Sequence, residues 1–229
     1  MEKAAILFMG PPGTGKGTQA FKVTERFPNF THFDTGGEIY RRITDPRFAG
    51  DPVVQKQKEI YFSGELNDPQ WVSDLIAERI KTYAEQDRGV VFSGSPRTLH
   101  EAKAIIPVLF DTYGRDRVLA FILEISKETA KKRSLGRISC SNKKCRYPAT
   151  KDQRGKPCPA CGTTLPMEDQ KDESWKVSHL KMRFKEYRER TLPAVKYLLS
   201  LGLGEILDGE ISVEETFTQV IEAIKRRFN

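Results

Sequence analysis

The sequence lacks any long uncharged apolar stretch. Its longest such runs, residues 4–9 and 118–123, contain six residues each, whereas a membrane-spanning helix needs about 18. The first run follows Lys3 and stops at the glycine–proline segment 10–13, with no small-residue cleavage site after it, so a secretory signal peptide is not expected. These absences favour a cytoplasmic protein with no membrane partner.

Cysteine is also scarce, with four residues among 229. Because thiols stay reduced in the cytosol, the four cysteines need a role other than disulfide formation. The chain has 38 Lys and Arg against 31 Asp and Glu, a net charge of +7, which favours nucleotides, nucleic acid or acidic surfaces as partners. Its 38% hydrophobic content excludes disorder as the main state, and its length suits one domain with small insertions.

Short apolar segments alternate with helical periodicities along the chain. Strands are expected at residues 4–9, 32–34, 89–92, 118–123 and 205–207. Helices are expected after residue 15, from Pro69 to Tyr83, from Ser126 to Gly136 and over 213–228. Apolar residues over 177–187 mark a further, long helix that is expected to be interrupted near Pro193. Asp68 and the pair Ser212 and Glu215 are expected to cap two of them. The alternation predicts an α/β fold with a parallel five-stranded sheet in a three-layer α/β/α arrangement.

The segment 139–172 interrupts this pattern. It has neither a helical nor a strand period and is rich in Cys, Pro, Gly, Lys and Thr. It contains all four cysteines, so we expect an inserted subdomain with its own cross-linking chemistry rather than a linker.

The strongest functional motif is the phosphate loop that begins at Gly10. Gly10, Gly15 and Lys16 have the required spacing, between an expected buried strand and an expected helix. Glycines let successive N–H groups point at phosphate oxygens, the helix N-terminus adds partial positive charge, and Lys16 adds a full charge. Gly17 stands where most such loops have Ser or Thr, and Thr18 follows it.

This variant of the loop resembles that of nucleoside monophosphate kinases, and adenylate kinase in particular. Further matches follow in the same order along residues 4–225: Asp34-Thr35-Gly36, Ser63-Gly64, Ser93-Gly94-Ser95-Pro96-Arg97-Thr98, Arg133 with Arg137, Arg183 four residues before Tyr187, and Asp208-Gly209. The resemblance covers the whole chain.

The resemblance implies reversible phosphoryl transfer from ATP, with Mg²⁺, to AMP, giving two ADP. It implies a core P-loop domain (1–34, 69–137 and 173–229), a monophosphate-binding region (35–68) and a zinc-bearing lid (138–172). The implied catalytic residues are Lys16, Arg97, Arg133, Arg137 and Arg183. The implied ATP-binding residues are Gly13, Thr14, Gly15, Lys16, Gly17, Thr18, Arg133, Arg137 and Ile211. The implied AMP-binding residues are Thr35, Gly36, Arg41, Glu65, Leu66, Asn67, Gly94, Arg97, Glu101 and Arg183.

Several positions depart from the family pattern. The family's metal-associated aspartates are replaced by Ser93 and Gly37, so Mg²⁺ is expected to be held mainly by phosphates and water, or by a carboxylate such as Glu38. Tyr40 occupies the place of a family arginine, and we expect Arg41 to take over its role. The second lid arginine has no clear match in the segment 171–173.

Glu101 replaces the glutamine with which the family reads adenine. A carboxylate accepts from the adenine amino group but cannot donate to a ring nitrogen, and it can also accept from guanine or cytosine. A kinase for GMP, CMP or UMP is therefore the alternative to an adenylate kinase.

The four cysteines form two close pairs, Cys140 with Cys145 and Cys158 with Cys161, separated by 12 residues. Thiolates at this spacing can close a tetrahedral zinc site with no open position, which makes the site structural. A lid of about 30 residues is too small for a core of its own, so zinc would replace that core. Some adenylate kinases carry such a site, although the first pair is spaced more widely here.

A different functional class is a zinc-ribbon nucleic-acid binder that uses ATP as a switch. The net charge and the basic lid favour it. Against it, no strand ends in the acidic pair of an ATPase motor, and no basic patch interleaved with aromatic residues is evident. We therefore expect no nucleic-acid partner. A monomer is expected as the default for a kinase that closes on hinges. His32 and His100 are expected to be structural rather than catalytic.

Overall fold

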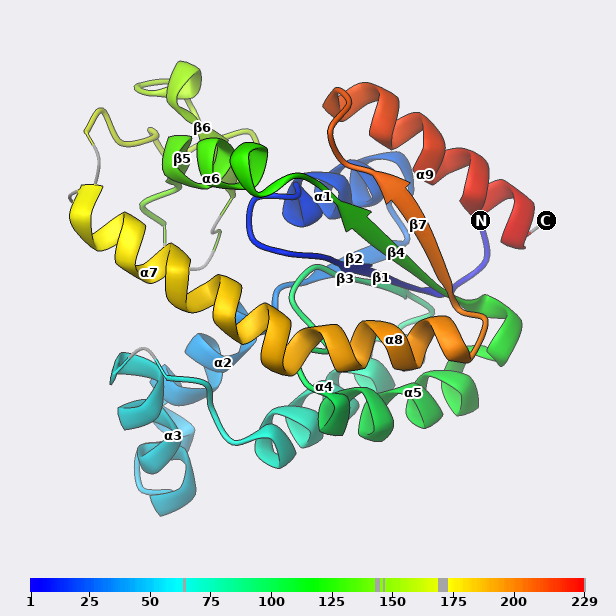
Figure 1. Ribbon diagram of the computed structural model, residues 1–229. Coiled ribbons are helices and arrows are strands. Elements are labelled where there is room, and N and C mark those ends of the chain that lie inside the picture. The colour runs from blue at the N-terminus through cyan, green and yellow to red at the C-terminus, as the bar shows by residue number, and fades with distance from the viewer. Residues whose placement is uncertain (64, 143–144, 146, 169–172, 229) are drawn as a thin grey trace.

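A parallel β-sheet forms the centre of the computed structural model (Figure 1). The structure describes residues 1–63, 65–142, 145, 147–168 and 173–228, with the backbone alone at 139, 148 and 173–176. The five strands of the central sheet are β1 (Ala5–Met9), β2 (Phe30–Phe33), β3 (Gly89–Phe92), β4 (Val118–Glu124) and β7 (Gly204–Asp208). They follow the order β2-β3-β1-β4-β7 and are all parallel, which confirms the predicted α/β architecture.

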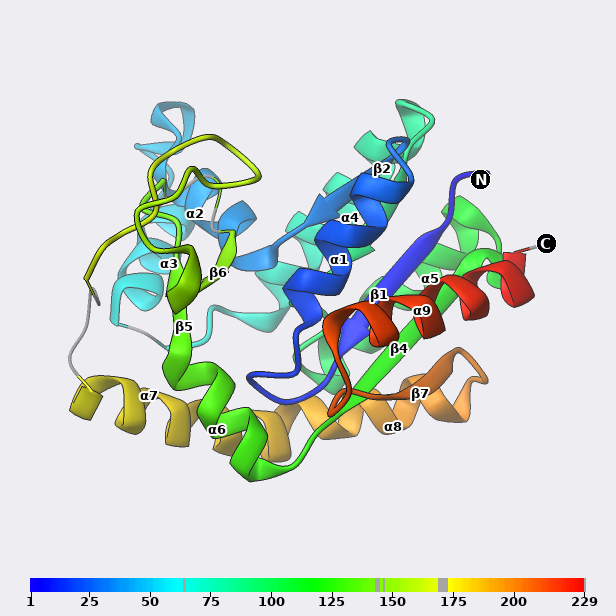
Figure 2. The same cartoon turned by 90° about the horizontal axis from the view of Figure 1, so that it is seen from above.

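Helices cover both faces of this sheet, as Figures 1 and 2 show. Parallel strands need long crossover connections, and here helices supply them. One face is covered by α1 (Lys16–Arg26) and α9 (Val213–Phe228), the other by α4 (Pro69–Glu85), α5 (Leu99–Tyr113) and α8 (Leu192–Ser200). Along β1, Leu7 packs on the face covered by α4, α5 and α8, and Phe8 packs on the face covered by α1 and α9. The strand is therefore buried on both faces, and its sequence is an uninterrupted apolar run.

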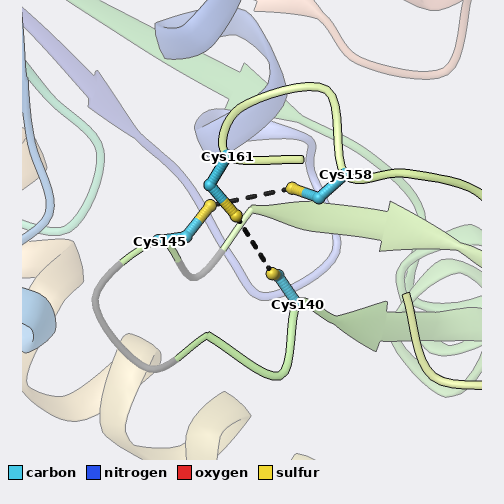
Figure 3. A group of neighbouring side chains, drawn as sticks. All are labelled: Cys140, Cys145, Cys158 and Cys161. Atoms are coloured by element: carbon cyan, nitrogen blue, oxygen red, sulfur yellow. Dashed lines mark hydrogen bonds between the residues drawn. The ribbon is translucent and has the colours of Figure 1, made fainter. Parts of the chain in front are cut away.

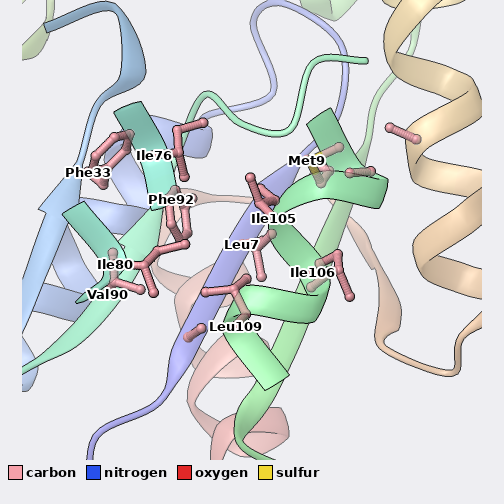
Figure 4. Close-up of a cluster of buried hydrophobic side chains, with 14 of the residues drawn as sticks. Leu7, Met9, Phe33, Ile76, Ile80, Val90, Phe92, Ile105, Ile106 and Leu109 are labelled. Carbon is pink, nitrogen blue, oxygen red and sulfur yellow. The ribbon is translucent and has the colours of Figure 1, made fainter. Parts of the chain in front are cut away.

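The larger apolar cluster lies between the sheet and α4, α5 and α8. Figure 4 shows Leu7, Val90 and Phe92 of the sheet against Ile76 and Ile105 of the helices. Each of these side chains is fully buried, and burying one such side chain stabilises the fold by about 1.5–3 kcal/mol. On the opposite face, Phe8 stacks on Phe121 at 5.3 Å between ring centroids.

The predicted helix starts are confirmed at three places. Asp68 accepts a hydrogen bond from the Trp71 N–H at 2.9 Å, and Ser126 accepts one from the Thr129 N–H at 3.2 Å and caps α6 (Lys127–Gly136). Ser212 and Glu215 bond each other's backbone N–H groups at 3.0 and 3.2 Å, which is the expected capping box.

Asp34 was expected in a strand, but β2 ends at Phe33. Asp34 instead caps α2 (Thr35–Thr44), and its Oδ2 accepts from the Gly37 N–H at 3.0 Å. A short carboxylate at this position satisfies one of the open N–H groups of the helix and so ends the strand. The sequence patterns also missed α2, α3 (Pro52–Ser63) and α5 as helices.

The expected interruption near Pro193 lies slightly earlier in the chain. A π-helical turn, η4 (Tyr187–Thr191), separates α7 (Glu173–Glu186) from α8, and Pro193 lies in the first turn of α8. Proline has no N–H to bond the preceding turn, and its ring crowds the carbonyl four residues back. The widened turn accommodates both effects.

Two short strands that the sequence did not predict lie at the start of the inserted segment and within it. β5 (Arg137–Ser139) and β6 (Pro148–Thr150) form an antiparallel pair. Strands of three residues are too short to show a period-2 pattern. Three short 3₁₀ segments complete the described elements: η1 (Pro46–Phe48), η2 (Arg115–Arg117) and η3 (Lys151–Gln153). None of the described helices has the length and apolar content to cross a membrane.

Candidate active site

The phosphate loop connects the carboxyl end of β1 to the N-terminus of α1. Strand β1 is the central strand of the sheet, and the strand order reverses direction there. Ligands of open α/β sheets bind at such points. Gly10 and Gly13 have φ angles of +137° and +87°. A Cβ on Gly10 would lie 2.4 Å from the Leu123 carbonyl oxygen, and a Cβ on Gly13 would lie 2.5 Å from the Ala130 carbonyl oxygen. Only glycine fits this close backbone approach.

Lys16 extends back over the loop from the first turn of α1. Its Nζ donates to the carbonyl oxygens of Gly10 and Pro11 at 2.9 and 2.8 Å. Burial lowers the pKa of Lys16 well below its usual value, and the positive charges of Arg183, Arg97 and Arg137 lower it further. The positive charges of these three arginines thus act on Lys16, and an anionic ligand would relieve the repulsion among the four groups.

A cavity of about 500 Å³ opens beside this loop. Its wall includes ten of the residues implied to be catalytic or nucleotide-binding: Lys16, Thr35, Gly36, Glu65, Leu66, Asn67, Gly94, Arg97, Glu101 and Arg183. The other residues of that set lie outside its lining: Gly13, Thr14, Gly15, Gly17, Thr18, Arg41, Arg133, Arg137 and Ile211. The cavity therefore gathers nine of the ten residues assigned to the acceptor monophosphate, together with the loop lysine.

Arg97 is held on the cavity wall by the loop that precedes α5. Its Nε donates to the Gly94 carbonyl oxygen at 2.8 Å, and its backbone N–H donates to Glu101 Oε2 at 2.8 Å. The Thr191 hydroxyl donates to the Arg97 carbonyl oxygen at 2.9 Å. The turn η4 is thus fastened to the loop that positions this guanidinium.

Arg133, on α6, binds the turn that follows β7. Its guanidinium donates to the carbonyl oxygens of Gly209 at 2.6 Å, Glu210 at 3.3 Å and Ile211 at 3.5 Å. The Gly209 N–H in turn donates to the Glu124 carbonyl oxygen at 2.8 Å. In this structure Arg133 organises the turn at Ile211, and its contact with phosphate stays a prediction.

Glu38 is buried and both of its carboxylate oxygens are engaged. Oε1 accepts from Arg41, and Oε2 accepts from Arg79 Nε at 3.1 Å. This pairing disfavours Glu38 as a magnesium ligand, because two guanidinium groups already neutralise it. Arg41 pairs with Glu38 and lies outside the cavity lining. Its expected contact with the monophosphate stays a prediction.

Ser93 lines the cavity at the end of β3 and is hydrogen-bonded to His32 of β2. His32 Nε2 and Ser93 Oγ lie 2.7 Å apart. Burial lowers the pKa of His32 to about 4; Asp34 opposes this shift and Arg41 adds to it. His32 is therefore neutral at pH 7. It holds a hydroxyl at the position where the family pattern has a carboxylate.

Some cavity residues were missed from the sequence. Arg190 and Glu186 line the cavity together with Arg183. Their spacing of three and four residues would place them on one helical face, and that signal could have found them. The second lid arginine, sought at 171–173, and Gly64 lie outside the residues whose side chains the structure describes.

The four cysteines meet in the lid, as predicted from their spacing (Figure 3). Cys140 Sγ lies 3.6 Å from Cys161 Sγ, Cys145 Sγ lies 3.7 Å from Cys158 Sγ, and all four sulfurs lie within 4.8 Å of one another. Sulfurs bound at about 2.3 Å to a tetrahedral zinc would be about 3.8 Å apart, whereas a disulfide needs about 2 Å. The thiols are free, and their arrangement fits zinc.

The lid also contacts the phosphate-loop helix directly. The Tyr147 ring, two residues after Cys145, lies 5.2 Å from the Phe21 ring of α1. Phe21 in turn packs edge-on against His32 at 4.6 Å between centroids. A chain of ring contacts therefore joins the cysteine cluster to the cavity wall at Ser93.

Comparison with known proteins decides the family. The family model described as adenylate kinase matches residues 8–202. The chain belongs to the adenylate kinase family. The adenylate kinases of Thermotoga maritima and Petrotoga mobilis are 30% and 31% identical to it, over 96% and 98% of this chain and 97% and 98% of theirs. That of Syntrophomonas wolfei is 30% identical, over 96% of this chain and 98% of its own.

Family membership makes the chain a phosphotransferase that acts on nucleotides. For an adenylate kinase, the positive side chains of this cavity have a direct chemical role. Phosphoryl transfer needs little covalent chemistry from the protein and depends on positioning and on stabilisation of spreading negative charge. Lys16, Arg97, Arg183 and Arg190 line this cavity and bring positive charge to it.

Proposed function

We propose that this adenylate kinase transfers the γ-phosphoryl group of ATP to AMP, reversibly and with Mg²⁺, to give two ADP. The observation that carries the proposal is the cavity in which Lys16 of the phosphate loop meets Arg97 and Arg183. A polyphosphate at the loop and a monophosphate at the arginines would bring donor and acceptor oxygens together at one point. The family relationship supports this assignment of the two nucleotides.

Each cation has a part in this mechanism. Lys16 neutralises charge on the transferred group, and its Nζ is pre-positioned by the carbonyl oxygens of Gly10 and Pro11. Arg97 and Arg183 orient the acceptor phosphate, because a planar guanidinium pairs with two phosphate oxygens at once. Arg133 and Arg137 would add to the charge as the lid closes over ATP and excludes water.

Magnesium bound with ATP would neutralise charge on its phosphate oxygens. The residues here fit an ion held mainly by phosphates and water, since Glu38 is engaged by two arginines. The Ser93 hydroxyl lines the cavity and can hydrogen-bond to a water of such an ion. A structural zinc at the four cysteines would hold the lid in shape.

The test is ADP formation from ATP and Mg²⁺ with AMP as acceptor, in protein whose zinc content has been measured. We expect rapid turnover with AMP and the reverse reaction from ADP alone. The absence of ADP formation with AMP, in folded zinc-containing protein, would refute the proposal. Salt-sensitive binding to nucleic acid by the same protein would then favour a binding function.

A further inference from the structure

The Glu101 carboxylate is buried in the cavity wall, with 5% of the residue exposed. It lies in the first turn of α5, where its backbone N–H donates to the Thr98 hydroxyl at 3.0 Å. Oε2 accepts the backbone N–H of Arg97 at 2.8 Å. Carboxylates are rarely buried to this degree unless they are paired with a cation.

Glu101 has no such cation. Among the described residues, no lysine or arginine forms an ion pair with it, and none donates a hydrogen bond to Oε1. The Arg97 guanidinium is directed to the Gly94 carbonyl oxygen instead. Burial raises the pKa of Glu101, although the Arg97 N–H, the charges of Arg97 and Arg190, and a hydrogen bond with the Thr98 side chain oppose that shift. A buried carboxylate that lines a cavity and has no ion-pair partner favours a ligand that brings N–H donors.

The same cavity has an apolar wall that includes Ile39, Leu66 and Val72, which suits a flat base. The edge of guanine presents two adjacent donors, N1–H and the 2-amino group, and a carboxylate can accept from both. The edge of adenine presents one donor beside a ring nitrogen that only accepts, and an ionised carboxylate cannot donate to it. The chemistry of Glu101 therefore complements guanine better than adenine.

We propose that Glu101 makes a guanine nucleoside monophosphate a second phosphoryl acceptor of this cavity, alongside AMP. The inference rests on the proposed kinase function and names a further substrate for the same site. An oxygen of the GMP phosphate forms a bond to the γ-phosphorus of ATP while the bond from that phosphorus to the β–γ bridging oxygen breaks. The products are ADP and GDP, and no redox partner is needed.

The first test compares kcat/KM for GMP and AMP in the unmodified protein and in Glu101→Gln. We expect the unmodified protein to use GMP within about tenfold of AMP, and Glu101→Gln to lower the GMP-to-AMP ratio by about 10- to 100-fold. Glutamine can both donate and accept and so suits adenine. Glu85→Gln, an exposed change at the end of α4, should leave the ratio unchanged.

The second test needs no variant and compares GMP with inosine monophosphate, which lacks only the 2-amino group. We expect kcat/KM for inosine monophosphate to be lower by about tenfold, because one hydrogen bond to the buried carboxylate is lost. Equal use of the two acceptors, or a ratio that Glu101→Gln does not change, would overturn the inference while AMP turnover upheld the kinase. Loss of transfer to every acceptor would overturn the proposed function itself.

Discussion

At the scale of single residues, the cavity brings the positive charges of Arg97 and Arg183 close to the phosphate-loop lysine, Lys16. Burial lowers the pKa of Lys16, and the charges of Arg183, Arg97 and Arg137 lower it further. Glu38 engages Arg41 and Arg79 elsewhere, so it does not compete with a ligand for Lys16, Arg97 or Arg183. The free protein bears an electrostatic cost that bound phosphate would remove.

Lys16→Ala should therefore lower kcat/KM for ADP formation by about 10²- to 10³-fold, as the loss of one pre-positioned charge donor does in other enzymes. Lys22→Ala, on the same helix, is the matched control. Lys22 pairs with Glu214 at 2.8 Å, away from the cavity, so its removal should leave activity unchanged. Retention of more than a tenth of the activity by Lys16→Ala would contradict the role assigned to Lys16.

His32 should make stability depend on pH. Its pKa is about 4 in the folded protein against 6.5 for the free side chain, so the unfolded chain binds the proton first. Its contribution is fully present above pH 6.5 and is lost as the pH falls toward 4. Between pH 7 and pH 5 the unfolding free energy should fall by about 2 kcal/mol more than in His32→Gln.

Urea unfolding of both proteins at the two pH values measures this difference. The comparison between them cancels other groups that titrate in this range. Equal losses in the two proteins would show that His32 is not buried in its neutral form.

At the scale of elements, the lid depends on its four thiols for a fixed shape. Besides the cysteines, its buried cluster contains only Ile138, Ala149 and Leu165 among the side chains described. Such a core is too small to order a segment of this size. Tyr147 joins the lid to α1 through Phe21, so the order of the lid should affect the position of the phosphate-loop helix.

Removal of zinc should therefore loosen the lid selectively. We expect one zinc per chain and, after chelation or in Cys158→Ser, at least a tenfold loss of hydrogen-exchange protection over residues 137–165. Strands β1 and β4 should keep their protection, and Lys151→Ala should behave as the unmodified protein does. A chain without zinc, or a lid that keeps its protection after chelation, would contradict the assignment.

At the scale of the whole molecule, the two-sided burial of the sheet dominates stability. β1, β3 and β4 supply side chains to both apolar clusters. Phe121 is fully buried and stacks on Phe8. Phe62, in contrast, is 61% exposed at the end of α3.

Phe121→Ala should lower the free energy of unfolding by about 3–5 kcal/mol, because it removes apolar contacts and leaves a cavity in a close-packed region. Phe62→Ala should change it by about 0.5 kcal/mol or less. Denaturant unfolding with circular dichroism measures both. A loss below about 1 kcal/mol in Phe121→Ala would mean that the sheet repacks around the missing ring.

Features that depend on local spacing could be predicted from the order of the residues. The strand–loop–helix around Lys16 and the caps at Asp68 and Ser212 lie where they were predicted. The grouping of the four cysteines in one cluster was also predictable. Each of these features is encoded within a few tens of residues, so it can be recognised without knowledge of the fold.

Contacts between distant segments could not be predicted in this way and became known from the folded structure. It placed Glu38 against Arg79, joined His32 to Ser93, and left Glu101 buried without a cation. In a parallel sheet the carboxyl ends of strands far apart in the chain meet at one edge. The partners found there depend on strand order and helix packing, which no local pattern of residues encodes.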